Sequence, residues 1–376
     1  MNYKSIQALA LSLLFSMSTF ASTEKNDSTE VANVVLRKWL DGSYLSSQIF
    51  LGYQYYNFPN SGANEFVVKR GYINFSKDIS PFIVGRITPD ITIDQEGDGE
   101  GDVELRLKYC YMQFKIPTWS FITEPSIYIG QVFTPWIEFE EKINRYRVEG
   151  AHFLNRIKQT PSADFGVTFT TLIGGKLDSD YRKLVNSRYA GKFGSIAIGI
   201  YNGGGYHALE KNSNKTFQWR VSIRPLPKSL TGFQLSATGV IGKGNTNLSP
   251  QWNMKSIALS YEHEWFNITG QGYSAIGDYA GCLIDETTGN SLLNKGNSAF
   301  AEIKLLKKKV SLIGRYDFQN VKSNGNWLHS TRYIAGIAYH LTGRNKIMLD
   351  YNQLVHSNNH PLADEQLFEI LLELAL

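Results

Sequence analysis

Residues 217–224 read Phe-Gln-Trp-Arg-Val-Ser-Ile-Arg, so that an apolar side chain is followed by a polar one at every step. Successive side chains on a β-strand point to opposite faces, and a period of two therefore predicts a strand with one apolar and one polar face. The same alternation recurs at 103–111, 257–262, 310–319 and 332–341. We expect a chain with this pattern to be all-β.

The stretch 103–111 shows how the two faces are assigned. By strict alternation its apolar face carries Val103, Leu105, Leu107, Tyr109 and Tyr111, and its polar face carries Glu104, Arg106, Lys108 and Cys110. Tyr109 and Tyr111 are therefore expected on the same side of the sheet as the leucines.

Extending the pattern predicts sixteen strands, at 48–58, 65–76, 82–91, 103–115, 124–134, 162–173, 186–201, 216–224, 231–242, 254–263, 266–276, 297–305, 310–319, 331–341, 346–355 and 366–376. Connections after even-numbered strands are mostly short and those after odd-numbered strands mostly longer, although the one after the sixth strand is longer than this rule expects. Short turns at one end and long loops at the other are typical of outer-membrane barrels. The pattern predicts a closed antiparallel transmembrane β-barrel, with the apolar last strand pairing with the first to remove open edges.

The amino terminus has the features of a secretory signal. Lys4 precedes an apolar run at 8–15, and Thr19-Phe20-Ala21 provides a small-residue exit, which predicts a signal peptide at 1–21. We assign 22–47 to an N-terminal periplasmic segment, with 31–40 as a short amphipathic helix or a mobile arm, and 48–376 to the barrel.

Composition excludes several classes of protein. The chain has 376 residues, of which 42% are hydrophobic, 13% aromatic and 19% charged, which is too polar for a bundle of membrane helices. A net charge of +4 without a basic patch argues against a nucleic-acid partner. Cys110 and Cys282 match no metal-ligand spacing, and no HExxH, GxSxG or P-loop motif occurs. We therefore expect neither an enzyme nor a cofactor or metal site.

If the polar face lines a water-filled lumen, its charges decide which ions pass. The basic residues on that face are Arg70, Arg86, Arg106, Lys108, Arg220, Arg224, Arg315 and Arg332, with Lys304 and Lys346. The acidic residues on that face are Asp90, Glu104, Glu262, Glu302, Asp317, Asp350, Glu369 and Glu373. Because the positive excess is slight, we expect at most a weak preference for anions. The alternative is that these charges keep the barrel wet and pair across strands.

The connection at 135–161 is long for a compact fold, which suggests a function. We expect it to fold into the barrel and narrow it, presenting Glu138, Glu140, Glu141, Lys142, Arg145 and Arg147 near the constriction. Opposed acidic and basic groups there would create a transverse field that slows or orients solutes. A solvated surface loop is the alternative.

Three stretches carry a family resemblance: Arg86-Ile-Thr-Pro-Asp-Ile-Thr-Ile-Asp94, Leu105-Arg-Leu-Lys-Tyr109 with Tyr111 and Phe114, and Gly130-Gln-Val-Phe-Thr-Pro-Trp-Ile-Glu-Phe-Glu-Glu141. They resemble the phosphate-selective porin O and P family in its Bacteroidota form. The resemblance implies a sixteen-stranded, trimeric porin in the outer membrane of a Gram-negative cell that passes anions. The loop at 94–102 is acidic and no dense lysine cluster occurs, so phosphate selectivity is not expected from the residues themselves.

The leading hypothesis is an outer-membrane porin for passive diffusion of small hydrophilic solutes, surrounded by outer-membrane lipids. Two alternatives stay open. One is a secreted soluble β-protein that binds glycans through exposed aromatic residues. The other is a barrel lipase with Ser330 and His340 as its catalytic pair. Carboxylates in the 94–102 loop leave open a Ca²⁺ site, beside the alternative of a solvated acidic loop.

Overall fold

The computed structural model describes residues 41–58, 61–94, 101–357 and 360–376. The expected signal peptide, the expected helix or arm at 31–40 and most of the acidic 94–102 loop lie outside the described residues. The chain divides into two units, Met1–Ser43 and Tyr44–Leu376. The fold described below is that of the second unit.

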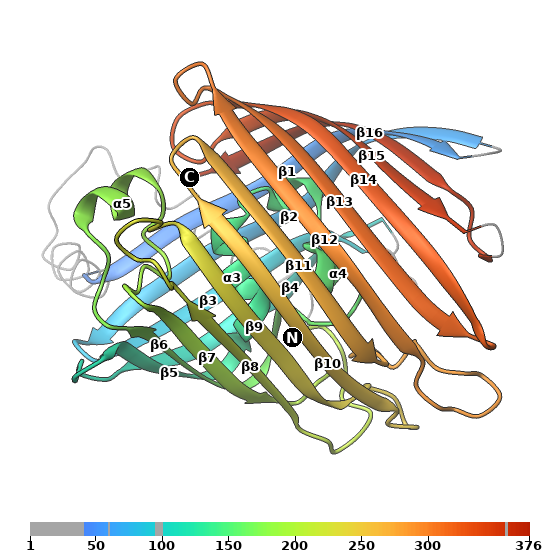
Figure 1. The fold of residues 1–376 in the computed structure, drawn as a ribbon, viewed down its shortest axis with the longest axis horizontal. Helices are drawn as coiled ribbons and strands as arrows, with labels where there is room; N and C mark the ends of the chain where they lie inside the picture. The colour runs from blue at the N-terminus through green and yellow to red at the C-terminus, as the bar shows by residue number, and fades with distance from the viewer. Residues whose placement is uncertain (1–40, 59–60, 95–100, 358–359) are drawn as a thin grey trace, which may run out of the picture. The chain divides into compact units, whose positions relative to one another are not determined.

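Within the described residues, sixteen strands form one closed barrel in which every strand pairs with its neighbours in the sequence (Figure 1). Antiparallel pairing of β1 with β16, from Gln48 opposite Ala375 to Asn57 opposite Gln366, closes the sheet. Closure leaves no strand edge with unpaired backbone groups. The all-β closed antiparallel fold expected from the sequence is thus confirmed. The strands are β1 Ser43–Phe58, β2 Ser61–Ser80, β3 Ile83–Ile93, β4 Val103–Lys115, β5 Ile122–Phe133, β6 Ala163–Ile173, β7 Gly194–Tyr201, β8 Thr216–Ile223, β9 Phe233–Lys243, β10 Gln251–Glu262, β11 Phe266–Ile276, β12 Leu293–Leu305, β13 Val310–Ser323, β14 Asn326–His340, β15 Lys346–His356 and β16 Glu365–Ala375.

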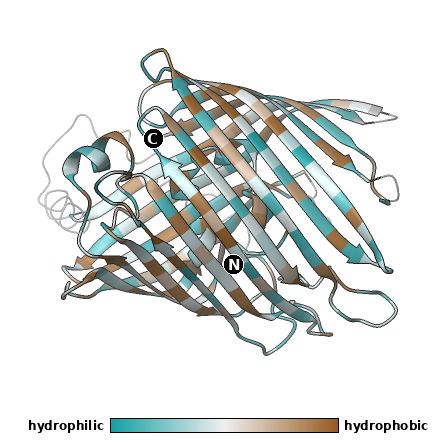
Figure 2. Ribbon diagram, viewed as in Figure 1, coloured by the Kyte–Doolittle hydropathy of each residue, from teal (hydrophilic) through white to brown (hydrophobic). Residues whose placement is uncertain are grey.

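The burial of side chains is the inverse of that in a water-soluble sheet. On β8 the polar residues Gln218, Arg220 and Ser222 are buried, whereas Val221 and Ile223 are exposed. Figure 2 shows the same alternation of hydrophilic and hydrophobic residues along the other strands. Polar side chains therefore face the inside of the barrel, and its outer wall is largely apolar. Such a wall is stable when lipid, not water, surrounds it.

Strand β4 departs from the strict alternation expected from the sequence. Pro89 pairs with Leu107 and Thr88 with Tyr109, so Lys108 is an extra residue in a β-bulge. Lys108 and Tyr109 are both buried, and Cys110 is exposed. The assignment of Tyr109 and Tyr111 to the outer face was therefore wrong, because a bulge shifts the alternation by one residue. Pro89 is the sequence signal for it, since proline cannot donate to the strand ladder.

Several strand boundaries also differ from the expected ones. The connection expected over 320–330 is a two-residue turn, Asn324-Gly325, with φ values of +49° and +80°. Asn-Gly adopts such positive φ angles readily and makes a tight hairpin, so strand pairing continues nearly to the turn. The strand expected from 186 begins at Gly194, and helix α5, Ser179–Leu184, lies in the connection before it.

The long connection after β5 contains the remaining short helices: α3 Pro135–Ile143, η2 Arg147–Glu149 and α4 Phe153–Arg156. Figure 1 shows α3 and α4 within the ring of strands. Trp136, Phe139 and Ile143 form a buried cluster with residues of β9, β10 and β11. The inward positions of the wall there are small, including Ser236, Ser256, Ala258 and Ser260, and leave room for these large side chains. None of the described helices has the length and apolar character needed to cross a membrane.

Candidate functional site: a narrowed lumen

We call residues 135–161 the inserted segment. Its start is fixed by Pro135, which occupies the first turn of α3, where a missing backbone N–H is tolerated. Its two ends are held together because the Thr134 hydroxyl donates to the Pro161 carbonyl at 2.6 Å. Within α3, Lys142 pairs with Glu138 one turn earlier, at 3.3 Å.

Buried groups on the barrel wall hold the inserted segment across the lumen. Arg220 donates through Nε to the Pro135 carbonyl at 3.1 Å, and its guanidinium lies 4.2 Å from the centre of the Phe139 ring. At the far side, Arg315 pairs with Glu149 at 2.8 Å. The Tyr146 hydroxyl donates to Glu302 at 2.7 Å. Because these partners come from well-separated strands, the segment spans the barrel instead of lying along one wall.

Three neighbouring cavities remain open beside the inserted segment. The largest, about 560 Å³, is bounded by β3 to β6 and by the connection between β6 and β7. A second, about 300 Å³, lies between the inserted segment and β1 to β4, and shares Ser76, Arg86, Glu138 and Arg188 with the first. A third, about 340 Å³, shares Arg145 and Arg344 with the second. Neighbouring cavities therefore share part of their lining.

The side chains around this open space are mainly basic. The lysines and arginines that border it are Arg86, Lys108, Lys115, Lys142, Arg145, Arg147, Lys176, Arg182, Arg188, Lys304, Lys308, Arg344 and Lys346. The acids are fewer, namely Glu124, Glu138, Glu141, Glu262, Glu264 and Glu302. A narrow passage with low-dielectric walls focuses the field of such charges. The positive excess around the open lumen therefore exceeds that expected from the inward strand residues alone.

The structure divides the expected pore-lining residues into three groups. Arg86 and Lys108 border the cavities. Arg70 and Arg106 are paired with the buried Asp90 at 2.8 and 3.3 Å, and Arg332 bonds to Asn352 at 2.7 Å. The third group is Arg220, Arg224 and Arg315, which are at most 5% exposed. These three lie on the polar face, as expected, but the segments packed over them separate them from the open lumen, and they anchor those segments instead.

Most of the residues expected at the constriction border the second cavity. They are Glu138, Glu141, Lys142, Arg145 and Arg147. Glu140 differs, because it accepts a hydrogen bond from Gln271 at 2.7 Å on the wall behind α3. Helix α3 therefore directs Glu138 and Glu141 to the lumen, where Arg86 and Lys108 also lie. It directs the carboxyl group of Glu140 to the barrel wall.

Sequence reasoning missed the basic residues in the connections. Arg182 and Arg188 come from the connection between β6 and β7, and Arg344 from the turn between β14 and β15. We had expected Arg188 on the strand at 186–201 and had assigned no role to Arg182 or Arg344. The unexpected length of the sixth connection was the one signal that could have identified Arg182.

Two neighbouring glutamates of α3 have opposite electrostatic environments. Burial alone would raise the pKa of Glu141, but Lys108 and Arg147 outweigh burial and lower the pKa to about 2. Burial raises the pKa of Glu140 to about 7, against the opposing effects of Arg315 and of the hydrogen bond from Gln271. Glu141 therefore stays charged at neutral pH, whereas Glu140 titrates there.

The raised pKa of Glu140 predicts a pH-dependent stability. Between its ordinary value of 4.5 and about 7, the folded chain holds a proton that the unfolded chain releases. The free energy of unfolding therefore falls as pH rises through this window. We expect Glu140→Gln to reduce the loss of Tm between pH 5 and pH 8 by about 2 °C, measured on the detergent-solubilised protein. Glu141→Gln is the matched control, and an undiminished loss in Glu140→Gln would contradict the assignment.

The lipase alternative requires a hydrogen bond between Ser330 and His340, which the structure does not contain. Ser330 Oγ lies 2.8 Å from Nδ1 of His356, whereas His340 Nε2 lies 2.8 Å from Ser311 Oγ. Ser330 and His340 are thus engaged with other partners. Among the residues that the structure describes, no group of three or more His, Cys, Asp or Glu side chains is placed to hold a metal ion.

No family model matches the chain, and no curated protein matches it. Several solved structures do. An anion-selective porin from Comamonas acidovorans aligns with a TM-score of 0.61 at 9% identity, over 89% of this chain and 99% of that one. OmpF of Salmonella typhi in complex with daunomycin aligns with a TM-score of 0.59 at 12% identity, over 89% of this chain and 98% of that one. OmpT of Vibrio cholerae in its trimer form aligns with a TM-score of 0.56 at 11% identity, over 89% of this chain and 100% of that one. This chain therefore has the sixteen-stranded barrel fold of the porins.

Proposed function

We propose that this chain is an outer-membrane porin through which small hydrophilic solutes diffuse passively, with a preference for anions. The observation that carries the proposal is the inverted burial of the barrel, whose outer wall is largely apolar and whose interior is polar. A soluble glycan-binding protein with this outer wall would expose a large apolar surface to water. A lipid bilayer around the barrel removes that cost.

The anion preference is supported by the basic side chains that border the open lumen and by the small number of acids facing them. Arg188 and Arg344 add positive charge beyond that of the strands. Phosphate is one candidate among the anions, as the family resemblance implies. In outer-membrane barrels the short turns lie on the periplasmic side, so we expect the end of this barrel that carries the short turns to face the periplasm.

Reconstitution of the mature protein into planar bilayers tests the proposal. We expect step-like currents, with a reversal potential in a KCl gradient that reports anion preference. A protein that stays soluble without detergent and gives no currents would refute a porin. A reversal potential on the cation side would refute the anion preference alone.

We further propose that three copies associate, as the trimer form of OmpT from Vibrio cholerae suggests for a barrel of this fold. Chemical cross-linking in native membranes would then give a ladder that ends at three copies.

The two arginines of the inserted segment predict a measurable change in ion selectivity. Arg145 and Arg147 both border the second cavity. Replacing both with Ala removes positive charge at the narrow part of the lumen, so we expect the ratio of anion to cation permeability to fall about twofold or more. Reversal potentials in a KCl gradient measure this ratio. The control is Lys307→Ala with Lys309→Ala, two exposed lysines on the β12–β13 turn that border none of the three cavities. An unchanged permeability ratio in the double arginine variant would show that Arg145 and Arg147 do not contribute to ion selectivity.

A further inference from the structure

The connection between β6 and β7, residues 174–193, is the longest at its end of the barrel, and we call it the inner flap. It is tied to the inserted segment and to the wall at once. The Asn186 side-chain amide donates to the Lys142 carbonyl at 3.0 Å and to Glu262 at 2.7 Å. Arg145 donates to the Val185 carbonyl at 2.9 Å. These bonds hold the inner flap over part of the lumen.

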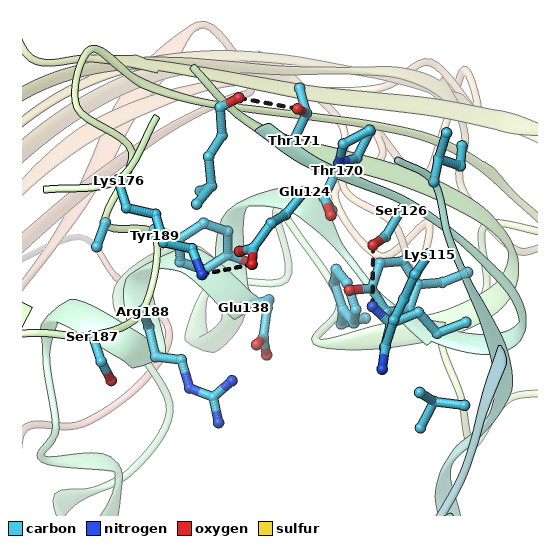
Figure 3. A pocket seen from close by; sticks show the side chains of 18 of the residues that line it. Lys115, Glu124, Ser126, Glu138, Thr170, Thr171, Lys176, Ser187, Arg188 and Tyr189 are labelled. Carbon is cyan, nitrogen blue, oxygen red and sulfur yellow. Dashed lines mark hydrogen bonds and ion pairs between the residues drawn. The ribbon is translucent and has the colours of Figure 1, made fainter. Parts of the chain in front are cut away.

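Tyr189 and Arg188 are two of the inner-flap residues that line the largest cavity. Tyr189 packs edge-on against Phe139, with ring centres 5.3 Å apart, and its φ of +50° is unusual for a bulky residue. The guanidinium of Arg188 makes no hydrogen bond or ion pair with any residue that the structure describes. Figure 3 shows Arg188 extending from the flap into the same open space as Glu138. A free guanidinium is thus held at the edge of the cavity.

The opposite wall supplies a second arginine and a set of aromatic rings. Arg86 is oriented by Asn74, which accepts from Nη2 at 2.6 Å, and by the Tyr111 hydroxyl, 3.4 Å from Nη1. The Tyr128 ring lies 5.4 Å from that of Tyr111 and 4.9 Å from that of Phe133. The β-bulge in β4 turns Tyr111 inwards. An aromatic surface therefore lines a polar lumen on the side that carries Arg86.

Neutral polar groups complete the lining of the cavity. Ser126, Thr170 and Ser187 border it, and Figure 3 shows them around the same space. Of the acids there, Glu124 is paired with Lys176 at 2.5 Å and Glu138 with Lys142 at 3.3 Å. The cavity thus combines unneutralised guanidinium groups, ring faces and hydroxyl groups.

We propose that Arg86 and Arg188, with the rings of Tyr111, Tyr128 and Tyr189, form a binding subsite for a phosphorylated monosaccharide. The proposal rests on the proposed function and names a solute class for the same pore. Guanidinium groups bind phosphate oxygens with paired hydrogen bonds. The C–H face of a sugar ring is apolar and packs on aromatic rings, and its hydroxyl groups match the neutral polar groups of the lining.

Other ligand classes use the cavity less completely. An inorganic anion would engage the arginines and leave the rings unused. A planar aromatic acid would engage the arginines and the rings but leave the hydroxyl-bearing residues without ligand partners. The volume of about 560 Å³ lies within the range of small-molecule sites.

Block of the KCl current in planar bilayers tests the proposal. The blockers are glucose 6-phosphate, glucose, inorganic phosphate and benzoate. We expect glucose 6-phosphate to block at a concentration about tenfold lower than any of the others. Equal block by inorganic phosphate, or stronger block by glucose or benzoate, would overturn the subsite as a sugar-phosphate site.

Variants separate the contributions of charge and ring. Arg188→Gln and Arg86→Gln should each raise the blocking concentration of glucose 6-phosphate about tenfold, whereas Lys183→Gln, exposed on the same flap, should not. Tyr128→Leu should weaken block by the sugar phosphate without weakening block by phosphate, and the outward-facing Tyr333→Leu should change neither. If glucose 6-phosphate blocks the arginine variants at the same concentration as the unmodified channel, this inference is refuted and the proposed function is not. Absence of any channel would refute the proposed function.

Discussion

Replacement of Arg315 with Ala is expected to undock the far part of the inserted segment and to raise the single-channel conductance and its fluctuations. Arg315 pairs with Glu149 at 2.8 Å and with Asp317 at 3.1 Å, and all three side chains are nearly inaccessible to solvent. Removing one partner from such a buried group leaves uncompensated charge and costs about 3–5 kcal/mol. Because the wall strands keep their backbone hydrogen bonds, the inserted segment is the element free to respond.

Conductance recordings of the variant and of Lys322→Ala separate this effect from a simple loss of charge. Lys322 lies on the same strand, β13, and is exposed. Lys322→Ala should therefore leave the single-channel conductance and the current noise unchanged. If Arg315→Ala also behaves like the unmodified protein, the Glu149 ion pair is not what holds the segment in the lumen.

Replacement of Ile257 with Arg is expected to destabilise the barrel in lipid by about 2–4 kcal/mol, the cost of an arginine on the lipid face near the bilayer midplane. Ile257 is 73% exposed on the outer face and lies in the middle of β10. In water the same change would replace an exposed apolar group by a charged one and cost little. The prediction therefore tests the membrane environment itself.

Urea titration of the protein folded into lipid vesicles measures this change in the free energy of unfolding. The matched control is Gln251→Arg, at the first residue of the same strand, on the same face. Near the membrane interface an arginine costs about 0–1 kcal/mol. Equal effects at both positions would mean that no apolar layer surrounds the middle of the barrel.

Strand positions could be predicted from the sequence because one physical rule governs them along most of the chain. Where lipid contacts one face and water or polar side chains the other, each strand must alternate, as 217–224 and 310–319 do. Closure by β16 was also predictable, since a terminal strand has an edge of unpaired backbone groups that pairing with the first strand removes. The bulge at Lys108 broke the rule, and a proline in the neighbouring strand was its one local sign.

The candidate site was predictable in its parts and less so in its arrangement. The length of 135–161 indicated an inserted segment, and the charges of Glu138, Glu141 and Arg145 were visible in the sequence. That Arg220 and Arg315 anchor this segment was not visible, because a residue on an inward face can either meet water or be covered by a distant part of the chain. Arg188 was missed because the strand was expected to begin at 186, whereas it begins at Gly194 and Arg188 lies on the connection before it.

By itself, the sequence determined the all-β class, the sixteen strands and which face of most strands is polar, because hydrophobic alternation is a local property that needs no partner. The tertiary structure alone decided which charges border the open lumen and which are covered. That outcome depends on where the inserted segment and the inner flap pack, through contacts between residues far apart in the chain, such as Tyr146 with Glu302 and Asn186 with Glu262.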